Sequence, residues 1–352
     1  MFDSLKVIDL STVLAGPSVA TFFAELGAEV LKIENTSIPD VTRSWKLPIE
    51  DKNSTVSAYF SSINYKKKYI QLNLKEKADY QIFLEIIKDA DILISNFKKG
   101  DEEKLNIQDA TLRSINPKLI IGKINGFGTK SDRVAYDLIL QAETGFMSMN
   151  GTENSGPVKM PVAFIDVLAG HQLKEGLLLA LLQREKTGIA KSVSVSLYDA
   201  AVCSLVNQAS NYLMGNQIPK RIGSLHPNIA PYGETFTTKE GDLITFAIGN
   251  DVHFMKLCSF LNLPEIPNDI RFITNALRVK NRKGLQKILQ EKIQEIPTDV
   301  ILNKMLSENV PAGKIKNLEE VFSNADAQNL IREEEIEGIN TKRVTSIAFK
   351  WE

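Results

Sequence analysis

Asp166 is the residue of this 352-residue chain whose type and position best suit it to chemistry. It follows Met160–Ile165 (MPVAFI), which predicts a short buried strand, and it precedes a leucine-rich stretch with helical spacing. A carboxylate that opens a helix lies among unpaired backbone N–H groups, and the helix dipole favours its ionised form. Such a carboxylate is a competent nucleophile. The feature alone also fits a structural role, because aspartate is a common helix N-cap.

Two groups of lysines indicate where a phosphorylated ligand could bind. Lys98, Lys99 and Lys104 follow the predicted strand Asp91–Ser95, and a second group, Lys66–Lys68, precedes another predicted strand. Cations at the strand ends of one sheet can bind phosphate oxygens. Each group taken alone is more often a solvated basic surface, so the pairing of the two carries the prediction.

The elements that must position these residues alternate between strand and helix in the first half of the chain. The predicted strands are Lys6–Leu10, Glu29–Ile33, Lys68–Leu74, Asp91–Ser95, Leu119–Ile124 and Ser192–Leu197. The predicted helices are Ser18–Leu26, Ala78–Ala90, a long helix after Asp166 that stops at Gly188, and Asp199–Met214. This rhythm predicts an α/β fold with a parallel sheet covered by helices. Such sheets bind ligands beyond the carboxyl ends of their strands.

The second half has a different texture. Prolines and glycines become frequent after Gly215, Thr235–Ile248 predicts a hairpin, and several short helices follow. We therefore expect a second, smaller α+β domain. A last strand is predicted at Val344–Phe349.

Composition excludes several classes of function. The formal net charge is −1, which gives no overall attraction to nucleic acid or to an anionic membrane. No apolar run approaches the roughly 20 residues of a membrane helix, and no signal peptide is recognisable. The two cysteines and three histidines lack metal-type spacing, so we expect no metal. We expect a cytoplasmic protein with reduced thiols.

Ten segments, in this order, resemble the family III coenzyme A transferases of the CaiB/BaiF type, which include formyl-CoA transferase and carnitine CoA-transferase. They are VIDLSTVLAGP (7–17), AELGAEVLKIE (24–34), SNFKKG (95–100), NGFG (125–128), AYDLILQAETGFMSMNG (135–151), PVAFIDVLAG (161–170), VSVSLYDAA (193–201), HPNIAPY (226–232), GND (249–251) and VPAGKI (310–315). Single segments are weakly specific, but the ordered set spans nearly the whole chain.

The resemblance implies an interlocked homodimer of two-domain subunits. A large Rossmann-like, CoA-binding domain would comprise residues 1–200 and 317–352. Residues 201–222 would form a linker helix, and residues 223–316 would form the small α+β domain.

The resemblance also implies a mechanism. Asp166 would attack the thioester of an acyl-CoA donor, giving an acyl-aspartyl anhydride and then an aspartyl-CoA thioester, before CoA passes to an acceptor acid. Coenzyme A is then a co-substrate, and no tightly bound cofactor is expected. Tyr136 would lie near the thioester. Some members have glutamine at the position of Leu14, which cannot donate a hydrogen bond, so the oxyanion donors would be backbone amides, including those of the other subunit's small domain.

Matched by position, the residues implied in CoA or substrate contacts are Val13, Leu14, Ala15, Lys67, Lys68, Leu72, Asn96, Phe97, Lys98, Lys104 and Tyr136. Val13, Ala15 and Leu72 would line the adenine and pantetheine path. Asn96 and Phe97 match a family pair beside the nucleotide.

The basic contacts are less regular than in the family. Lys104 matches a phosphate-binding position, and either Lys67 or Lys68 matches another. Lys98 keeps the charge of the arginine in the family's Asn-Phe-Arg-Pro-Gly, but Lys99 replaces its proline. Lysine lacks the bidentate geometry of arginine, so the grip on phosphate changes.

Two other functions are compatible with parts of this pattern. An acyl-CoA racemase needs two acid/base groups on opposite faces of the substrate, and racemases carry a histidine where this chain has Tyr136. A CoA-binding protein without catalysis would not need Asp166, which is present.

Overall fold

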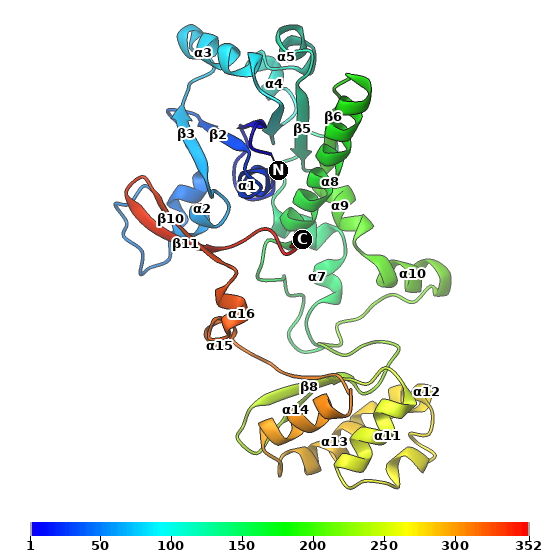
Figure 1. The fold of residues 1–352 in the computed structure, drawn as a ribbon. Coiled ribbons are helices and arrows are strands. Elements are labelled where there is room, and N and C mark those ends of the chain that lie inside the picture. Colours follow the sequence, from blue (N-terminus) through cyan, green and yellow to red (C-terminus); the bar gives the residue numbers. More distant parts are fainter. Residues whose placement is uncertain (1, 351–352) are drawn as a thin grey trace. The chain divides into compact units, whose positions relative to one another are not determined.

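A six-stranded parallel sheet forms the centre of the larger part of the molecule (Figure 1). The computed structural model describes residues 2–350. The strands are β1 (Lys6–Asp9), β2 (Glu29–Glu34), β3 (Lys67–Gln71), β4 (Ile92–Ser95), β5 (Ile120–Asn125) and β6 (Ser192–Ser196), in the order β3-β2-β1-β4-β5-β6. All neighbouring pairs are parallel. The chain winds away from β1 in both directions, so a switch point lies between β1 and β4.

Alternate residues of the strands enter two apolar cores on opposite faces of the sheet. The first contains Val7, Ile92, Ile94 and Ile120 with residues of α1 (Ala15–Glu25) and α8 (Phe164–Thr187). The second contains Ile8, Leu93 and Ile121 with residues of α3 (Lys77–Lys88) and α5 (Asp109–Ile115). Because side chains alternate along a strand, a strand covered on both faces becomes apolar throughout, as these sequences are.

A close contact between α1 and α8 fixes the start of both helices. A Cβ atom added at Gly170 of α8 would lie 2.8 Å from Ser18 Oγ and 3.3 Å from the Ala15 carbonyl oxygen of α1. Only glycine fits this approach. Asp166 precedes Gly170 by four residues, on the same side of α8, and therefore faces the region where α1 begins.

Shorter elements complete this part of the chain: η1 (Val41–Ser44), α2 (Ala58–Ser62), α4 (Asp101–Lys104), α6 (Asp137–Glu143), α7 (Phe146–Met149), α9 (Leu197–Cys203), α10 (Val206–Gly215), β10 (Ile331–Ile336) and β11 (Ile339–Val344). The hairpin β10–β11 packs against α2, and Arg343 donates a hydrogen bond to the Ser62 carbonyl oxygen at 3.0 Å.

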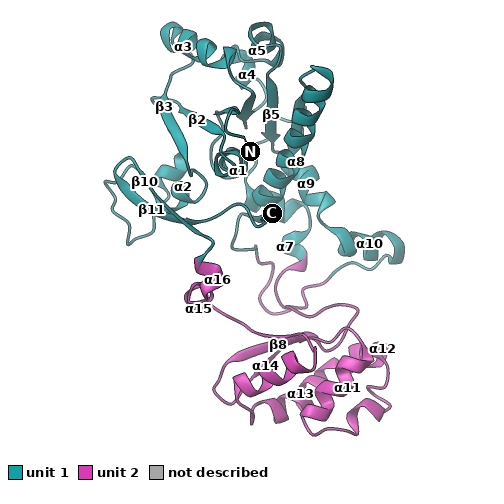
Figure 2. Cartoon of the chain, viewed as in Figure 1, with its two compact units in different colours: residues 1–148, 159–219, 329–352 teal, residues 149–158, 220–328 magenta. Residues whose placement is uncertain are grey.

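The chain divides into two compact units (Figure 2). The larger contains residues 1–148, 159–219 and 329–352, and the smaller contains residues 149–158 and 220–328. The smaller unit has an antiparallel sheet of β7 (Tyr232–Thr237), β8 (Leu243–Ala247) and β9 (Ala312–Lys314). Its helices are α11 (Asp251–Phe260), η2 (Ile266–Asn268), α12 (Asn275–Lys280), α13 (Arg282–Ile293), α14 (Thr298–Ser307), α15 (Leu318–Phe322) and α16 (Ala325–Gln328). It has its own apolar core.

The parallel sheet and the antiparallel hairpin confirm the predicted α/β class, but three predicted elements are wrong. Met160–Ile165 is not a strand, since α8 already begins at Phe164. The predicted helix Asp199–Met214 is two helices, α9 and α10, that break at Ser204 and Leu205. The last strand ends at Val344, where the prediction began, because it pairs with β10 through a turn at residues 337–338.

Candidate active site

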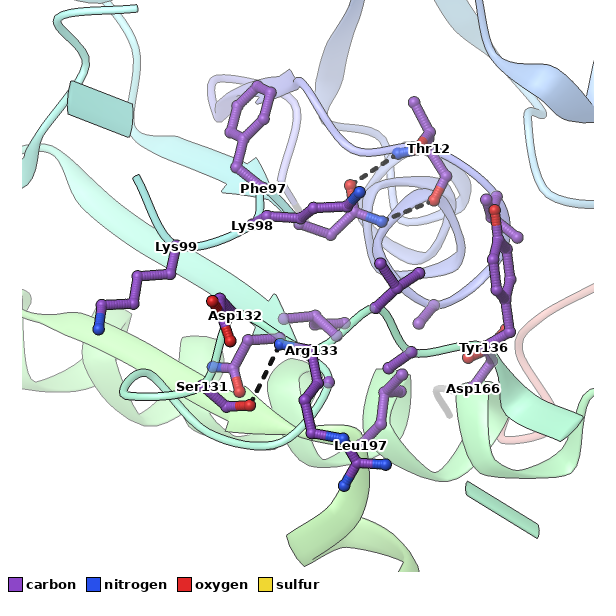
Figure 3. Close-up of a pocket in the computed structure, with 18 of the residues that line it drawn as sticks. Thr12, Phe97, Lys98, Lys99, Ser131, Asp132, Arg133, Tyr136, Asp166 and Leu197 are labelled. Atoms are coloured by element: carbon purple, nitrogen blue, oxygen red, sulfur yellow. Dashed lines mark hydrogen bonds between the residues drawn. The ribbon is translucent and has the colours of Figure 1, made fainter. Parts of the chain in front are cut away.

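A pocket opens at the carboxyl ends of β1, β4 and β5, where the sheet topology switches (Figure 3). Its walls are residues 12–15 after β1, 96–99 after β4, and 124–126 and 131–136 at and after the end of β5. Asp166 of α8 and Leu197 of α9 complete it. Doubly wound sheets bind their ligands at this position, so we expect the ligand of this protein to bind here.

Asp166 is the third residue of α8, and it is only 7% exposed. Burial, and second the charge of Asp137, raise the pKa of its carboxyl to about 7. The sequence predicted an ionised form favoured by the helix dipole. The loss of hydration outweighs that dipole, because desolvation penalises the charged form. Within residues 2–350 no group donates a hydrogen bond to this carboxylate, which leaves its oxygens available to a substrate.

Asp137, at the start of α6, supplies the cap that α8 lacks. Its Oδ1 accepts a hydrogen bond from the Ile165 backbone N–H at 2.7 Å, and its Oδ2 accepts one from Gln141 Nε2 at 2.6 Å. Gln141 Oε1 in turn accepts a bond from the Met160 backbone N–H at 2.8 Å. The N-cap residue of α8 is Ala163, which carries no capping oxygen. Asp137 and Gln141 therefore fix the segment that presents Asp166.

Tyr59 of α2 is a partly buried group whose pKa responds to the charge of Asp166. Burial, followed by the charges of Asp166 and Asp137, raises the pKa of its hydroxyl to about 12. Its ring contacts that of Trp45 edge-on at 5.1 Å between centroids. The hydroxyl thus stays protonated near neutral pH. Sequence reasoning missed Tyr59, Asp137 and Gln141, since only the fold brings them to Asp166; the four-residue spacing of Asp137 and Gln141 was visible.

Asn96 holds the loop that follows β1. Its Oδ1 accepts a hydrogen bond from the Thr12 backbone N–H at 3.0 Å, and its Nδ2 donates to the Thr12 carbonyl oxygen at 2.8 Å (Figure 3). Val13, next in the loop, has a left-handed φ of 71°. Asn96 lines the pocket as expected, but its amide is occupied by the loop.

A second cavity adjoins the first and shares Thr12, Phe97 and Lys98 with it. Its other lining residues include Leu72, Lys75 and Lys104. Lys104 Nζ lies 2.9 Å from Asp101 Oδ1 on an exposed surface. The structure therefore brings four of the expected CoA contacts, Leu72, Phe97, Lys98 and Lys104, to one cavity, while Val13, Leu14, Ala15 and Tyr136 line the pocket that holds Asp166.

The two lysines of the predicted phosphate contact at β3 lie elsewhere. Lys67 Nζ is fully buried, 2.8 Å from Asp9 Oδ2, and it also donates to the carbonyl oxygens of Pro17 and Ile63. Burial lowers its pKa to about 8 despite the pairing with Asp9. Lys68 Nζ lies 2.8 Å from Glu29 on the exposed edge of the sheet. Within the described chain neither lysine lines either cavity. Lys67 is held in a buried ion pair, and Lys68 lies on the exposed surface.

The described part of the chain has neither a candidate metal site nor a candidate membrane span. Residues 2–350 contain no group of three or more His, Cys, Asp or Glu side chains that could hold a metal ion. None of the helices in that range is both long and apolar enough to cross a membrane.

The fold and this pocket define an α/β protein with a titratable carboxylate at the switch point of its sheet, where such folds bind their ligands. Residues 2–351 match the family model of CoA-transferase family III. The chain belongs to this family, and it is a CoA transferase, an enzyme class that uses CoA thioesters as co-substrates.

Similar proteins support this assignment. The chain is 36% identical over 326 residues to the succinyl-CoA:glutarate CoA-transferase of Mus musculus, covering 92% of this chain and 74% of that protein. It is 34% identical over 330 residues to the succinate–glutarate CoA-transferase of Agrobacterium fabrum, covering 92% and 82%. A crystal structure of a CAIB/BAIF family protein from Brucella suis superposes with a TM-score of 0.85 at 34% identity, covering 99% of this chain and 92% of that one.

Proposed function

We propose that this enzyme moves CoA from an acyl-CoA donor to a carboxylic acid acceptor, with Asp166 as the covalent nucleophile. The observation that carries the proposal is the buried Asp166 carboxylate, which accepts no hydrogen bond from residues 2–350 and lines a pocket that adjoins a cavity with lysines in its wall. A pKa of about 7 leaves a large ionised fraction near neutrality. The same burial removes hydration from the nucleophile and keeps water from a hydrolysable intermediate.

The proposed reaction has four steps. An Asp166 oxygen attacks the thioester carbonyl, the C–S bond breaks, and an acyl-aspartyl anhydride and CoA thiolate form. The thiolate then attacks the aspartyl carbonyl, which releases the donor acid and leaves an aspartyl-CoA thioester. The acceptor carboxylate attacks this thioester, giving a second anhydride and the thiolate. A last thiolate attack on the acceptor's carbonyl yields the new acyl-CoA and frees Asp166.

The two cavities suit the two ends of an acyl-CoA. The nucleotide would lie in the cavity lined by Leu72, Phe97 and Lys104, and the thioester would reach the pocket of Asp166 and Tyr136. Leu14 offers no side-chain donor, and within residues 2–350 no side chain caps α1. The first backbone N–H groups of α1 are thus available to an oxyanion.

The acids are proposed by analogy with the relatives. Both curated relatives above are named for succinyl or succinate and glutarate, so we propose a short dicarboxylic acid as donor or acceptor. We further propose a homodimer in the cytoplasm. Residues 1–200 and 317–352 would form its CoA-binding domain, residues 201–222 a linker and residues 223–316 its small domain. Both cysteines are unpaired, as a reducing compartment requires.

Intact-protein mass spectrometry tests the covalent role of Asp166. The protein is incubated briefly with succinyl-CoA, with and without glutarate, and is compared with Asp166→Asn and with the surface control Asp89→Asn. We expect a CoA or succinyl adduct in wild type and in Asp89→Asn, cleared by hydroxylamine, and none in Asp166→Asn. Transfer to glutarate at the wild-type rate by Asp166→Asn would show that another nucleophile is used.

A further inference from the structure

Four charged side chains form a buried network beside the loop that follows β1. The side chains of Asp9, Lys32, Asp40 and Lys67 are all fully excluded from solvent. Lys67 Nζ lies 2.8 Å from Asp9 Oδ2, and Lys32 Nζ lies 3.2 Å from Asp40 Oδ2 and 3.9 Å from Asp9 Oδ2. The network contains two cations and two anions, so its charges are balanced.

Each side of this network is hydrogen-bonded to the loop. The Ser11 backbone N–H donates to Asp9 Oδ1 at 2.9 Å, and the Ser11 carbonyl oxygen accepts from Lys32 Nζ at 2.7 Å. The Val13 backbone N–H lies 3.3 Å from both carboxylate oxygens of Asp40. Two further hydrogen bonds join the Asn96 side chain to the Thr12 backbone. The backbone of residues 11–13 is therefore held by the side chains of Asp9, Lys32, Asp40 and Asn96.

The loop needs such a hold, because Val13 is strained. Its φ of 71° lies in the left-handed region, where a β-branched side chain is a genuine outlier. Strain of this kind persists only where the surroundings over-determine the conformation, and it gathers at ligand sites. Residues 12–15 line the pocket of Asp166, and Thr12 also lines the second cavity.

Stability alone does not explain four buried charges. The desolvation of buried ion pairs offsets much of their attraction, so well-packed apolar side chains would often serve a fold equally well. Buried polar networks that are fully satisfied specify one conformation instead. The conformation specified here is that of the loop that forms a wall of both cavities.

We propose that Asp9, Lys32, Asp40 and Lys67 are positioning residues for CoA transfer, which hold Val13 and its neighbours in the one loop conformation that receives the acyl-CoA. The inference rests on the proposed function, because it takes CoA as the ligand of the two cavities. Asp9, Lys32 and Lys67 line neither cavity, and Asp40 lies at the wall of the second cavity with a side chain that is fully excluded from solvent. Lys67, one of the two lysines that the resemblance offered as a phosphate contact, acts instead through Asp9 and Ser11.

Asp40→Asn is the sharpest test, since asparagine keeps the shape and can still cap Thr42 while it removes the charge that faces Lys32 and Val13. We expect the dissociation constant for free CoA and the KM for succinyl-CoA to rise together by about tenfold, with a smaller fall in kcat. A purely structural role would lower the thermal midpoint and the active fraction but leave KM unchanged. Lys88→Met, which removes an exposed pair with Glu85, serves as the matched control and should bind CoA like wild type.

Val13→Gly completes a double-mutant cycle. Glycine adopts a positive φ without strain, so the loop conformation no longer depends on the hydrogen bonds from the backbone N–H of residue 13 to Asp40. We therefore expect Asp40→Asn to weaken CoA binding clearly less in the Val13→Gly background than in wild type. If Asp40→Asn does not fold, Thr42→Val takes its place, because it removes only the 2.8 Å hydrogen bond from the Thr42 hydroxyl that orients Asp40.

The outcomes separate this inference from the proposed function. If wild type binds CoA but transfers it to no acid, the proposed function is wrong. The CoA affinities measured in the double-mutant cycle then still test the positioning role of the network. Equal CoA affinity of Asp40→Asn and wild type, additive effects in the cycle, or a wild type that does not bind CoA would each overturn the positioning role.

Discussion

The Asp166 carboxyl combines two properties that oppose each other in water. A carboxylate is a better nucleophile when its pKa is high, but it must be ionised to attack. Burial raises the pKa of Asp166 to about 7, which brings these two requirements together near neutral pH. The nucleophilic role that we propose for Asp166 therefore depends on how completely the pocket excludes water from this side chain.

The pH dependence of kcat/KM reports this ionisation in the free enzyme. Only the ionised form attacks, so activity should be low below the pKa, rise through an apparent pKa of about 7, and level off at higher pH. Steady-state rates at limiting succinyl-CoA, measured from pH 5 to pH 9 at constant ionic strength, check this. An acidic limb near the ordinary aspartate value, about 4, would contradict the buried and unpaired state of Asp166.

Asp137→Asn separates the two causes of the raised pKa. Burial is the larger cause and the negative charge of Asp137 the smaller, so the acidic limb of kcat/KM should move to lower pH without reaching the ordinary aspartate value. Asparagine Oδ1 can still accept the hydrogen bond from the Ile165 backbone N–H, which keeps α8 capped. Glu85→Gln, an exposed position of α3 outside both cavities, is the control and should leave the limb in place. An unchanged limb in Asp137→Asn would mean that burial acts alone.

The residue scale shows what a local sequence pattern can and cannot predict. Asp166 was singled out because an acid after an apolar run at a helix start is visible in the sequence, but that pattern also fits a helix cap, and the resemblance to the family decided between the two. Asp137 was not found, because α6 meets α8 only in the folded chain, and nothing in the sequence around Tyr59 relates it to Asp166. The choice between Lys67 and Lys68 as the phosphate contact stayed open, since no local pattern reveals that Lys67 pairs with Asp9, in another strand.

At the scale of elements, the strands were easier to predict than the helix starts. Strands β1 to β6 are short apolar runs between turn residues, and all six were predicted within a few residues. The start of α8 was placed two residues too late, because its cap comes from Asp137 in α6 rather than from a neighbouring residue. A boundary that depends on a distant side chain carries no local signal.

The crossing of α1 and α8 gives a prediction at the same scale. Gly170→Ala would place a Cβ atom 2.8 Å from Ser18 Oγ and 3.3 Å from the Ala15 carbonyl oxygen. Separating the two helices should lower the free energy of unfolding by about 1–3 kcal/mol. Since Ala15 and Asp166 line one pocket, kcat/KM should fall as well.

Gly284→Ala is the matched control for this substitution. Gly284 lies in α13, and a Cβ atom added there meets nothing within 4 Å. Alanine is the better helix former by up to about 1 kcal/mol, so Gly284→Ala should keep or raise stability without changing activity. Urea unfolding of both variants measures the difference. Equal stability of Gly170→Ala and wild type would mean that the two helices can part at no cost.

At the scale of the whole molecule, the larger unit exposes apolar side chains on three successive helices, α8, α9 and α10. They are Leu178, Leu179, Leu182, Val202, Val206, Leu213 and Met214. Leu213 is 77% exposed and Met214 is 89% exposed. Apolar surfaces of this kind usually mark a contact with another chain. Sequence periodicity could not reveal them, because it does not distinguish a helix face that enters the core from one that meets a partner.

A second copy of the chain is the partner that we propose for this surface, and light scattering after size-exclusion chromatography tests it. Wild type should have twice the chain mass of 39.2 kDa. Leu213→Lys would bury a charge in the contact, so this variant should shift toward the mass of one chain in a concentration-dependent manner. Leu306→Lys introduces the same change at a 76% exposed leucine of α14 and should leave the mass unchanged. A wild type with the mass of one chain at micromolar concentration would refute the dimer, and the exposed leucines of α8 to α10 would then need another partner.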